Sequence, residues 1–179
     1  MVASVPVSSW FISIIHYAQA HDWKVIALEL DHKDRRILKA LQENGRLQNV
    51  ELARRVGLSP SPCLRRVKRL EDAGVIERYA ALIDPAKVGL TLTVFVRIWL
   101  SSQDLATVER FNEQIKALPQ VQECHLMAGD SDFLLRVLVK DLEDYRRFQM
   151  EHLTRIDGVQ QVKTEIPMQQ IKQTLEVPL

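Results

Sequence analysis

The stretch Asn49–Glu71 (NVELARRVGLSPSPCLRRVKRLE) restricts what this chain of 179 residues can fold into more than any other part of it. Apolar residues recur at helical spacing on both sides of Gly57, which predicts a short helix from Asn49 and a longer one from Ser59-Pro60. Prolines are tolerated in a first turn because those N–H groups have no intrahelical partner. Two helices joined by a short turn containing glycine form a helix-turn-helix.

Each of these helices has an apolar face, and a further helix precedes them. That helix is expected to begin at Asp31, a good N-cap followed three residues later by Asp34, and to end near Asn44-Gly45 with the glycine in the left-handed conformation. Gly74 would close the last helix, and Val75–Ile83 suggests a strand pair or wing. The residues expected to face inward are Ile37, Leu38, Leu41, Leu52, Ala53, Val56, Cys63, Val67 and Leu70.

Charge is distributed unevenly along the chain. The formal net charge is only +1, but Arg46–Arg78 contains eight basic and four acidic residues, so this segment is +4 and the remainder is −3. Such asymmetry is typical of a module that faces DNA. A solvated basic face on an ordinary three-helix unit, or a sensor or interaction module that does not bind DNA directly, is the alternative.

The second helix of a helix-turn-helix presents its N-terminal residues to base edges in the major groove. A serine hydroxyl can bond to any base, and an arginine can bond to guanine with two donors. Other basic residues are better placed for phosphates, which give affinity without sequence information; whether Arg65 or Arg66 contacts bases stays open. The candidates for contact with double-stranded DNA are Asn49, Arg54, Arg55, Ser59, Ser61, Pro62, Arg65, Arg66 and Arg69.

The second half of the chain alternates strand and helix patterns in the order β-α-β-β-α-β, which is the ferredoxin-like arrangement. The expected elements are strands at Thr91–Leu100, Val121–Ala128, Asp132–Val139 and Val159–Ile171, and helices at Asp104–Leu118 and Leu142–Ile156. We therefore predict an α+β protein. Its expected parts are an N-terminal extension at 1–27, a winged helix-turn-helix domain at 28–83, a linker at 84–92 and a ferredoxin-like domain at 93–179.

A tight turn, Gly129-Asp130-Ser131-Asp132, lies between two of these strands. Asp and Gly supply turn geometry, which is one interpretation. The other is a ligand pocket, because exposed backbone amides hold a carboxylate and an aspartate pairs with an ammonium group, as a zwitterionic amino acid requires. A metal site or an enzyme would have to use His125, Asp130 and Asp132, but adjacent strand residues such as Cys124 and His125 point to opposite faces. We expect no metal, no cofactor and no enzymatic activity.

The cysteines and the hydropathy of the chain indicate the cellular compartment in which the protein works. Cys63 and Cys124 lie in apolar stretches and lack metal-ligand spacing, so we expect two buried thiols in a reducing cytoplasm. No apolar run approaches the length of a membrane span. The run Trp10–Ile15 is short and no Lys or Arg precedes it, which argues against a signal peptide.

Together these residues resemble the Lrp/AsnC (leucine-responsive, asparagine-regulator) family of transcriptional regulators. The likeness covers Leu30 to about Lys172 and is carried by LDHKDRRILKALQENGR, NVELARRVGLSPSPCLRRVKRLEDAGVI and VQECHLMAGDSDFLLRV. SPSPCLRRV and QECHLMAGDSD look closest to the leucine-responsive branch. The first 27 or so residues depart from the family pattern.

The resemblance implies a regulator that responds to an amino acid. Its DNA-reading helix would match Ser59–Leu70, its sheets would pair into homodimers, and four dimers would form an octamer. The effector would lie near the loop containing Met127, Ala128, Gly129, Asp130 and Asp132. The small size of each half independently favours oligomerisation, since a single small core is only marginally stable.

Overall fold

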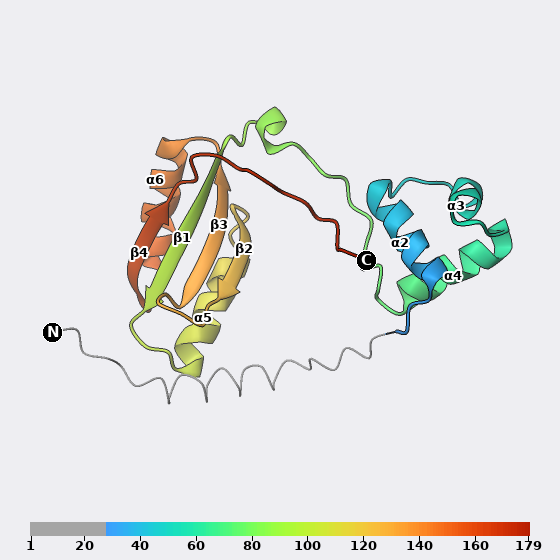
Figure 1. Ribbon diagram of the computed structural model, residues 1–179. Helices are drawn as coiled ribbons and strands as arrows, with labels where there is room; N and C mark the ends of the chain where they lie inside the picture. Colours follow the sequence, from blue (N-terminus) through green and yellow to red (C-terminus); the bar gives the residue numbers. More distant parts are fainter. Residues whose placement is uncertain (1–27) are drawn as a thin grey trace. The chain divides into compact units, whose positions relative to one another are not determined.

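The computed structural model describes residues 28–179, which form two compact units (Figure 1). The first contains the described residues up to Ala80 together with Glu176–Leu179, and the second is Ala81–Leu175. Glu176–Leu179 join the first unit through Gln42: the Val177 amide donates to Gln42 Oε1 at 2.6 Å, and Gln42 Nε2 donates to the Val177 carbonyl at 3.2 Å. The predicted extension at 1–27 lies outside the described residues.

Three helices make up the first unit: α2 (His32–Glu43), α3 (Asn49–Val56) and α4 (Pro60–Asp72). A reciprocal capping box starts α2, because the Asp34 amide donates to Asp31 Oδ1 at 2.9 Å and the Asp31 amide donates to Asp34 Oδ2 at 3.2 Å. Ser59 is the N-cap of α4 and Pro60 its first residue, as predicted. Gln48, not Asn49, is the N-cap of α3.

Gly57 ends α3 in the left-handed region with φ 68°, which is why a glycine stands in the turn of the helix-turn-helix. Lys33 of α2 donates to the carbonyls of Val56 at 2.9 Å and Gly57 at 3.3 Å, so carbonyls at the end of α3 gain a cationic partner. The three helices enclose one core of Ile37, Leu38, Ala40, Leu52, Ala53, Val56, Cys63 and Leu70.

Two local predictions for this unit are wrong. Gly45 does not have positive φ: α2 ends at Asn44 in an extended conformation, and Asn44 Oδ1 accepts a hydrogen bond from the Arg46 amide at 3.0 Å. The segment Val75–Ile83 contains no strand. It follows α4 as an irregular stretch in which the Tyr79 hydroxyl donates to Glu71 Oε1 at 2.9 Å. A strand needs a hydrogen-bonded neighbour, and no described segment pairs with residues 75–83.

The second unit is a four-stranded antiparallel sheet with strand order β2-β3-β1-β4, covered by two helices, which confirms the ferredoxin-like prediction (Figure 1). Its elements are η1 (Pro85–Val88), β1 (Leu92–Leu100), α5 (Leu105–Lys116), β2 (Val121–Leu126), β3 (Phe133–Val139), α6 (Leu142–Glu151), η2 (Leu153–Arg155) and β4 (Val159–Glu165). The predicted last helix is thus divided into α6 and η2, and the last strand ends at Glu165.

One face of the sheet packs against both helices. Alternate residues of β1 and β3 are buried there with Phe111 and Ile115 of α5 and with Tyr145 and Phe148 of α6. The opposite face carries half-buried side chains, including Phe95, Trp99, Leu134 and Leu138. The expectation of two buried thiols holds for Cys63 and is wrong for Cys124, which lies exposed on the edge strand β2.

Candidate DNA interface and effector loop

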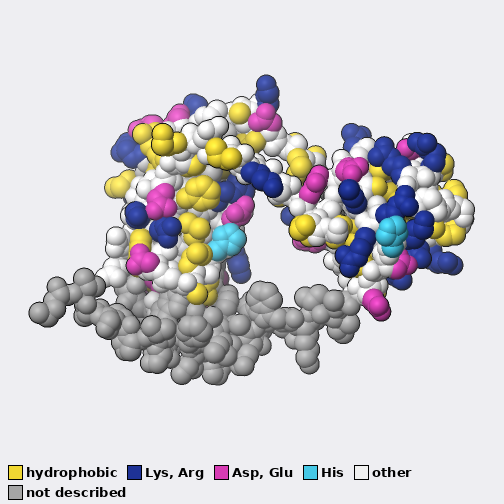
Figure 2. Space-filling model, viewed as in Figure 1, with side chains coloured by type: hydrophobic (Ala, Val, Ile, Leu, Met, Phe, Trp, Pro, Cys, Tyr) yellow, Lys and Arg dark blue, Asp and Glu magenta, His cyan; other side chains and the backbone are white. Residues whose placement is uncertain are grey.

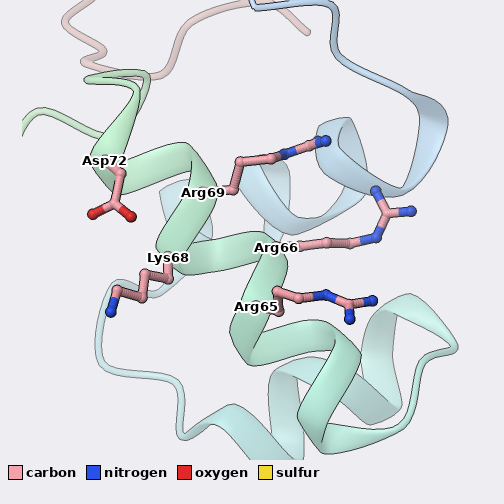
Figure 3. Close-up of a pocket in the computed structure, with 5 residues that line it drawn as sticks. All are labelled: Arg65, Arg66, Lys68, Arg69 and Asp72. Atoms are coloured by element: carbon pink, nitrogen blue, oxygen red, sulfur yellow. The ribbon is translucent and has the colours of Figure 1, made fainter.

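The exposed face of α4 carries the candidate DNA contacts. Ser61, Arg65, Lys68 and Asp72 recur at helical spacing on this face and are all exposed, as is Ser59 at the N-cap. Pro62 is half-buried. Arg65, Arg66 and Arg69 extend to one side of the helix and Lys68 to the other (Figure 3). No ion pair within residues 28–179 involves Arg65 or Lys68, so their charges are available to a polyanion.

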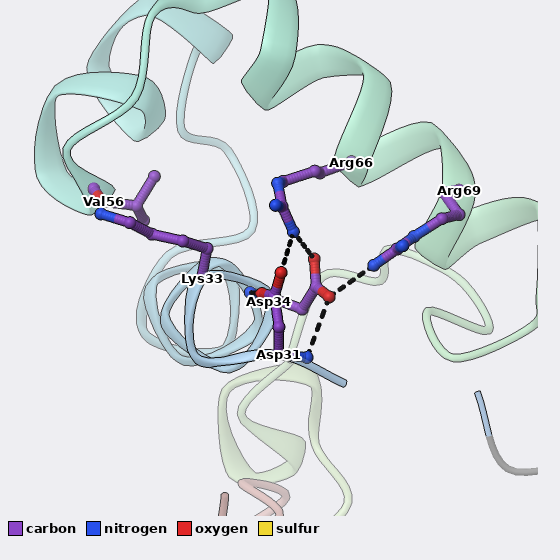
Figure 4. A network of polar contacts seen from close by, with 6 residues as sticks. All are labelled: Asp31, Lys33, Asp34, Val56, Arg66 and Arg69. Carbon is purple, nitrogen blue, oxygen red and sulfur yellow. Dashed lines mark hydrogen bonds and ion pairs between the residues drawn. The ribbon is translucent and has the colours of Figure 1, made fainter. Parts of the chain in front are cut away.

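Arg66 and Arg69 form ion pairs with aspartates at the start of α2. Arg66 Nη1 lies 2.7 Å from Asp31 Oδ2 and 2.8 Å from Asp34 Oδ1, and Arg69 Nη2 also bonds to Asp34 (Figure 4). The hydrogen bond from the Asp34 amide and the bond from Arg66 lower the pKa of Asp31 to about 2. The hydrogen bonds that Arg66 donates to Asp31 and Asp34 raise the pKa of Arg66. Arg69 was predicted as a phosphate contact and the role of Arg66 stayed open between bases and phosphates; the structure shows both in ion pairs within the unit.

The remaining candidates on α3 are also engaged. Arg54 and Arg55 pair with Glu51 at 2.9 and 3.1 Å, and these bonds lower the pKa of Glu51 to about 2. The Arg54 side chain nevertheless stays 77% exposed. Asn49 Nδ2 donates to the Pro60 carbonyl at 2.9 Å, which links the start of α3 to the start of α4. Asn49 therefore links α3 to α4, a role that its place at the start of a predicted helix did not reveal.

Basic side chains outnumber acidic ones over the whole first unit. Residues 28–80 contain twelve Lys and Arg against eight Asp and Glu. The face of this unit seen in Figure 2 is crowded with Lys and Arg side chains. Because cation excess concentrated on one compact unit attracts phosphates, this unit has the electrostatic character of a nucleic-acid-binding module.

The turn between β2 and β3 contains a buried carboxylate. Asp132 is 5% exposed, and its Oδ2 accepts from the Leu100 amide at 2.6 Å while its Oδ1 accepts from Gln103 Nε2 at 2.7 Å. The backbone of Asp132 forms two further hydrogen bonds. The Asp132 amide donates to the Ile98 carbonyl, and the Asp132 carbonyl accepts from the Met127 amide at 2.8 Å. Asp132 thus ties the end of β1 and the following loop to the turn.

The rest of the turn is more open. Ala128, Gly129 and Asp130 are exposed and Met127 is half-buried, and Trp99 Nε1 donates to the Asp130 carbonyl at 2.7 Å. Ser131 is buried, and its hydroxyl has no hydrogen-bond partner among the described residues. Serine is common in turns, so the sequence around Ser131 gives no signal that this hydroxyl is buried. An unpaired buried hydroxyl beside exposed backbone offers polar groups to a small ligand.

The residues considered for metal binding or catalysis do not form a joint site. His125 lies on the open sheet face, 3.5 Å from Glu123, whereas the Asp132 carboxylate is taken up by Leu100 and Gln103. Within residues 28–179 no group of three or more His, Cys, Asp or Glu side chains is arranged to hold a metal ion. In that same range, no helix has the length and apolar character that a membrane crossing requires.

A helix-turn-helix with an exposed basic helix, followed by a separate α+β unit, is the architecture of a DNA-binding regulator. Residues 30–77 match the family model described as winged helix-turn-helix DNA-binding, and residues 93–177 match that of the Lrp/AsnC ligand binding domain. The leucine-responsive regulatory proteins of Klebsiella pneumoniae and Escherichia coli K12 are each 46% identical to the chain over 146 residues, which is 82% of this chain and 89% of theirs. The chain belongs to the Lrp/AsnC family of transcriptional regulators.

Solved structures agree with this assignment. A transcriptional regulator of Neisseria meningitidis, solved as an L-Met complex, superposes with a TM-score of 0.81 at 41% identity and covers 84% of this chain and 97% of that one. An AsnC family regulator of Agrobacterium tumefaciens gives a TM-score of 0.80 at 42% identity over 83% of this chain and 97% of that one. The predicted family, the α+β architecture and the regulator function are therefore confirmed.

Proposed function

We propose that this regulator binds its DNA sites through the outward face of α4, with Ser59, Ser61 and Arg65 at base edges. Arg54 and Lys68 contact phosphates. The observation that carries this proposal is that Arg65 and Lys68 project from α4 without an ion pair in residues 28–179. Serine and arginine in the first turns of a recognition helix are the residue types that bond to bases in the major groove.

We further propose that an amino acid with an apolar side chain binds at the loop Met127–Asp132. Exposed backbone amides at Ala128–Asp130 and the unpaired Ser131 hydroxyl suit its carboxylate, and the Asp130 side chain is available for its ammonium group. The buried Asp132 carboxylate holds this loop in place through its bonds to the Leu100 amide and Gln103. Two relatives indicate the class of effector: one is named leucine-responsive, and another was solved with L-Met.

Thermal unfolding measured with each of the twenty amino acids tests the effector proposal. Leucine or methionine should raise the melting temperature in a concentration-dependent way, because a ligand that binds only the folded state stabilises it. The same compound should change the affinity for DNA, since a ligand that prefers one conformation shifts the equilibrium between them. If none of the twenty shifts either quantity, the loop is not an amino-acid site.

We also propose that the protein forms homodimers through the open face of the sheet, and octamers from four dimers. The support is the half-buried Phe95, Trp99, Leu134 and Leu138 on the face that no helix covers. Sedimentation analysis at micromolar concentration should show species of at least two chains, and Leu134→Glu should shift them towards monomer because it places a charge in the apolar contact. A wild type that sediments as a monomer throughout would contradict the dimer.

We propose that this regulator acts in the cytoplasm, where it would meet its DNA partner, and that it acts by binding rather than by catalysis. Its role requires neither a cofactor nor a metal, because DNA contacts and a reversible small-molecule effector suffice to switch a two-state regulator.

A further inference from the structure

We propose that Asp34 is a positioning residue for DNA recognition: its buried carboxylate fixes α4 against α2 through Arg66 and Arg69, and so keeps both arginines away from the DNA phosphates. This inference rests on the proposed DNA-binding role of α4. It assigns to two arginines of the recognition helix a function within the protein rather than on the ligand.

The contacts of Asp34 account for both of its carboxylate oxygens. The residue is fully buried, Oδ1 accepts from Arg66 at 2.8 Å, and Oδ2 accepts from the Asp31 amide at 3.2 Å and from Arg69. Figure 4 shows both guanidinium groups reaching from α4 to the start of α2. A buried carboxylate is tolerated only when charged partners and hydrogen bonds replace the lost water, so removal of any one partner is costly.

The cluster has no net charge. Two arginines face two aspartates, because Arg66 also bonds to Asp31 Oδ2 at 2.7 Å. A guanidinium that is neutralised in this way contributes little to counterion release on DNA binding, which depends on cations that meet phosphates. The cations of α4 left for DNA are therefore Arg65 and Lys68.

Two polar attachments act together with the buried Cys63 and Leu70 to hold α4 in place. Near its N-terminus, Asn49 of α3 donates to the Pro60 carbonyl, and in its second half Arg66 and Arg69 are held at the start of α2. Base contacts demand accurate placement, whereas phosphate attraction tolerates small shifts. Loosening the second attachment should consequently damage sequence discrimination more than overall affinity.

The test compares a duplex selected by the wild type from a randomised library with a scrambled duplex of the same length, by fluorescence anisotropy over a range of salt concentrations. In Asp34→Asn, affinity for the selected duplex should fall at least about tenfold. Affinity for the scrambled duplex should hold or rise, with a steeper salt dependence, because two arginines become available to phosphates. A purely structural role of Asp34 would lower both affinities by the same factor, and that result would overturn the proposal.

Arg66→Gln separates the proposal from direct phosphate binding. We expect it to reduce the ratio of selected to scrambled affinity as Asp34→Asn does, and the double variant to add little to either single change, because all three disrupt one contact. If Arg66→Gln instead weakened binding to both duplexes by the same factor and lowered the slope of log affinity against log salt concentration by about one, Arg66 would be a phosphate contact. The double variant Arg65→Gln/Lys68→Gln is the reference, because it removes the two cations of α4 that have no ion pair within residues 28–179. It should reduce the salt dependence of the DNA affinity, as the loss of phosphate contacts does.

Circular dichroism of each variant establishes that it is folded before binding is compared. If Asp34→Asn does not fold, Arg69→Gln is the second variant, because Asp34 keeps Arg66 and the Asp31 amide. Arg69→Gln should also lower the ratio of selected to scrambled affinity, but by a smaller factor than Asp34→Asn. An unchanged ratio would contradict the proposal. A wild type that binds both duplexes equally would contradict sequence-specific binding itself, which is a different failure.

Discussion

Replacing Phe111 by alanine should destabilise the ligand-binding unit by about 3–5 kcal/mol. Phe111 is fully buried, and its ring lies 4.4 Å from the ring of Phe133, centroid to centroid, so truncation leaves a cavity between α5 and the sheet. Hydrogen exchange followed by mass spectrometry measures the effect: amides of β1 and β3 should exchange faster by at least about a hundredfold, since their protection reflects the stability of this core.

The same measurement shows whether the two cores are independent. Amides of α2 and α4 should keep their protection, because their core residues belong to the other unit. Leu105→Ala is the matched control on α5, where the side chain is 62% exposed and the change should stay within about 0.5 kcal/mol. Equal acceleration in both units would contradict two separate cores.

Replacing Asp132 by alanine should lower stability by about 2–3 kcal/mol and abolish the response to the amino acid. The Leu100 amide would lose a charged hydrogen-bond partner in a buried place, and a lost bond of that kind costs about 1.5–3 kcal/mol. The loop before Asp132 would also lose its support. DNA binding without effector should be retained, because the substitution lies in the other unit. Chemical denaturation and an effector titration of DNA affinity measure the two effects.

Two further variants separate support of the loop from contact with the ligand. Asp132→Asn keeps an acceptor for the Leu100 amide, so it should preserve most of the stability and the effector response. An Asp132→Asn protein that is as stable as the wild type but unresponsive would place this carboxylate on the ligand. Asp130→Ala changes an exposed side chain. We expect unchanged stability and a weakened response, as a contact with the ligand ammonium requires.

Helices and strands were predictable here because their signals are local. The capping box at Asp31 and Asp34, the proline start of α4 and the left-handed Gly57 all lie within a few residues of the boundary they define. The order of strands and helices then admits few topologies. Val75–Ile83 shows the limit of this reasoning, because a largely apolar segment forms a strand only where another strand pairs with it.

Contacts between distant segments were not predictable. On a helical projection, Arg66 and Arg69 look like solvent-facing cations, and nothing in their neighbourhood indicates acids more than thirty residues earlier. Asp34 looks like a helix-start residue, which it is, but its burial depends on how α4 crosses α2. For Asp132 the sequence left turn geometry and a ligand contact both open, and it gave no sign of the bonds that its carboxylate makes with the Leu100 amide and Gln103.

The most direct test of the account is the affinity of the wild type and of Arg65→Ala for the selected and scrambled duplexes at one fixed salt concentration. The variant should lose about 1–3 kcal/mol on the selected duplex and much less on the scrambled one, because a guanidinium at a guanine edge distinguishes bases. An unchanged affinity for both duplexes would mean that the outward face of α4 does not meet DNA.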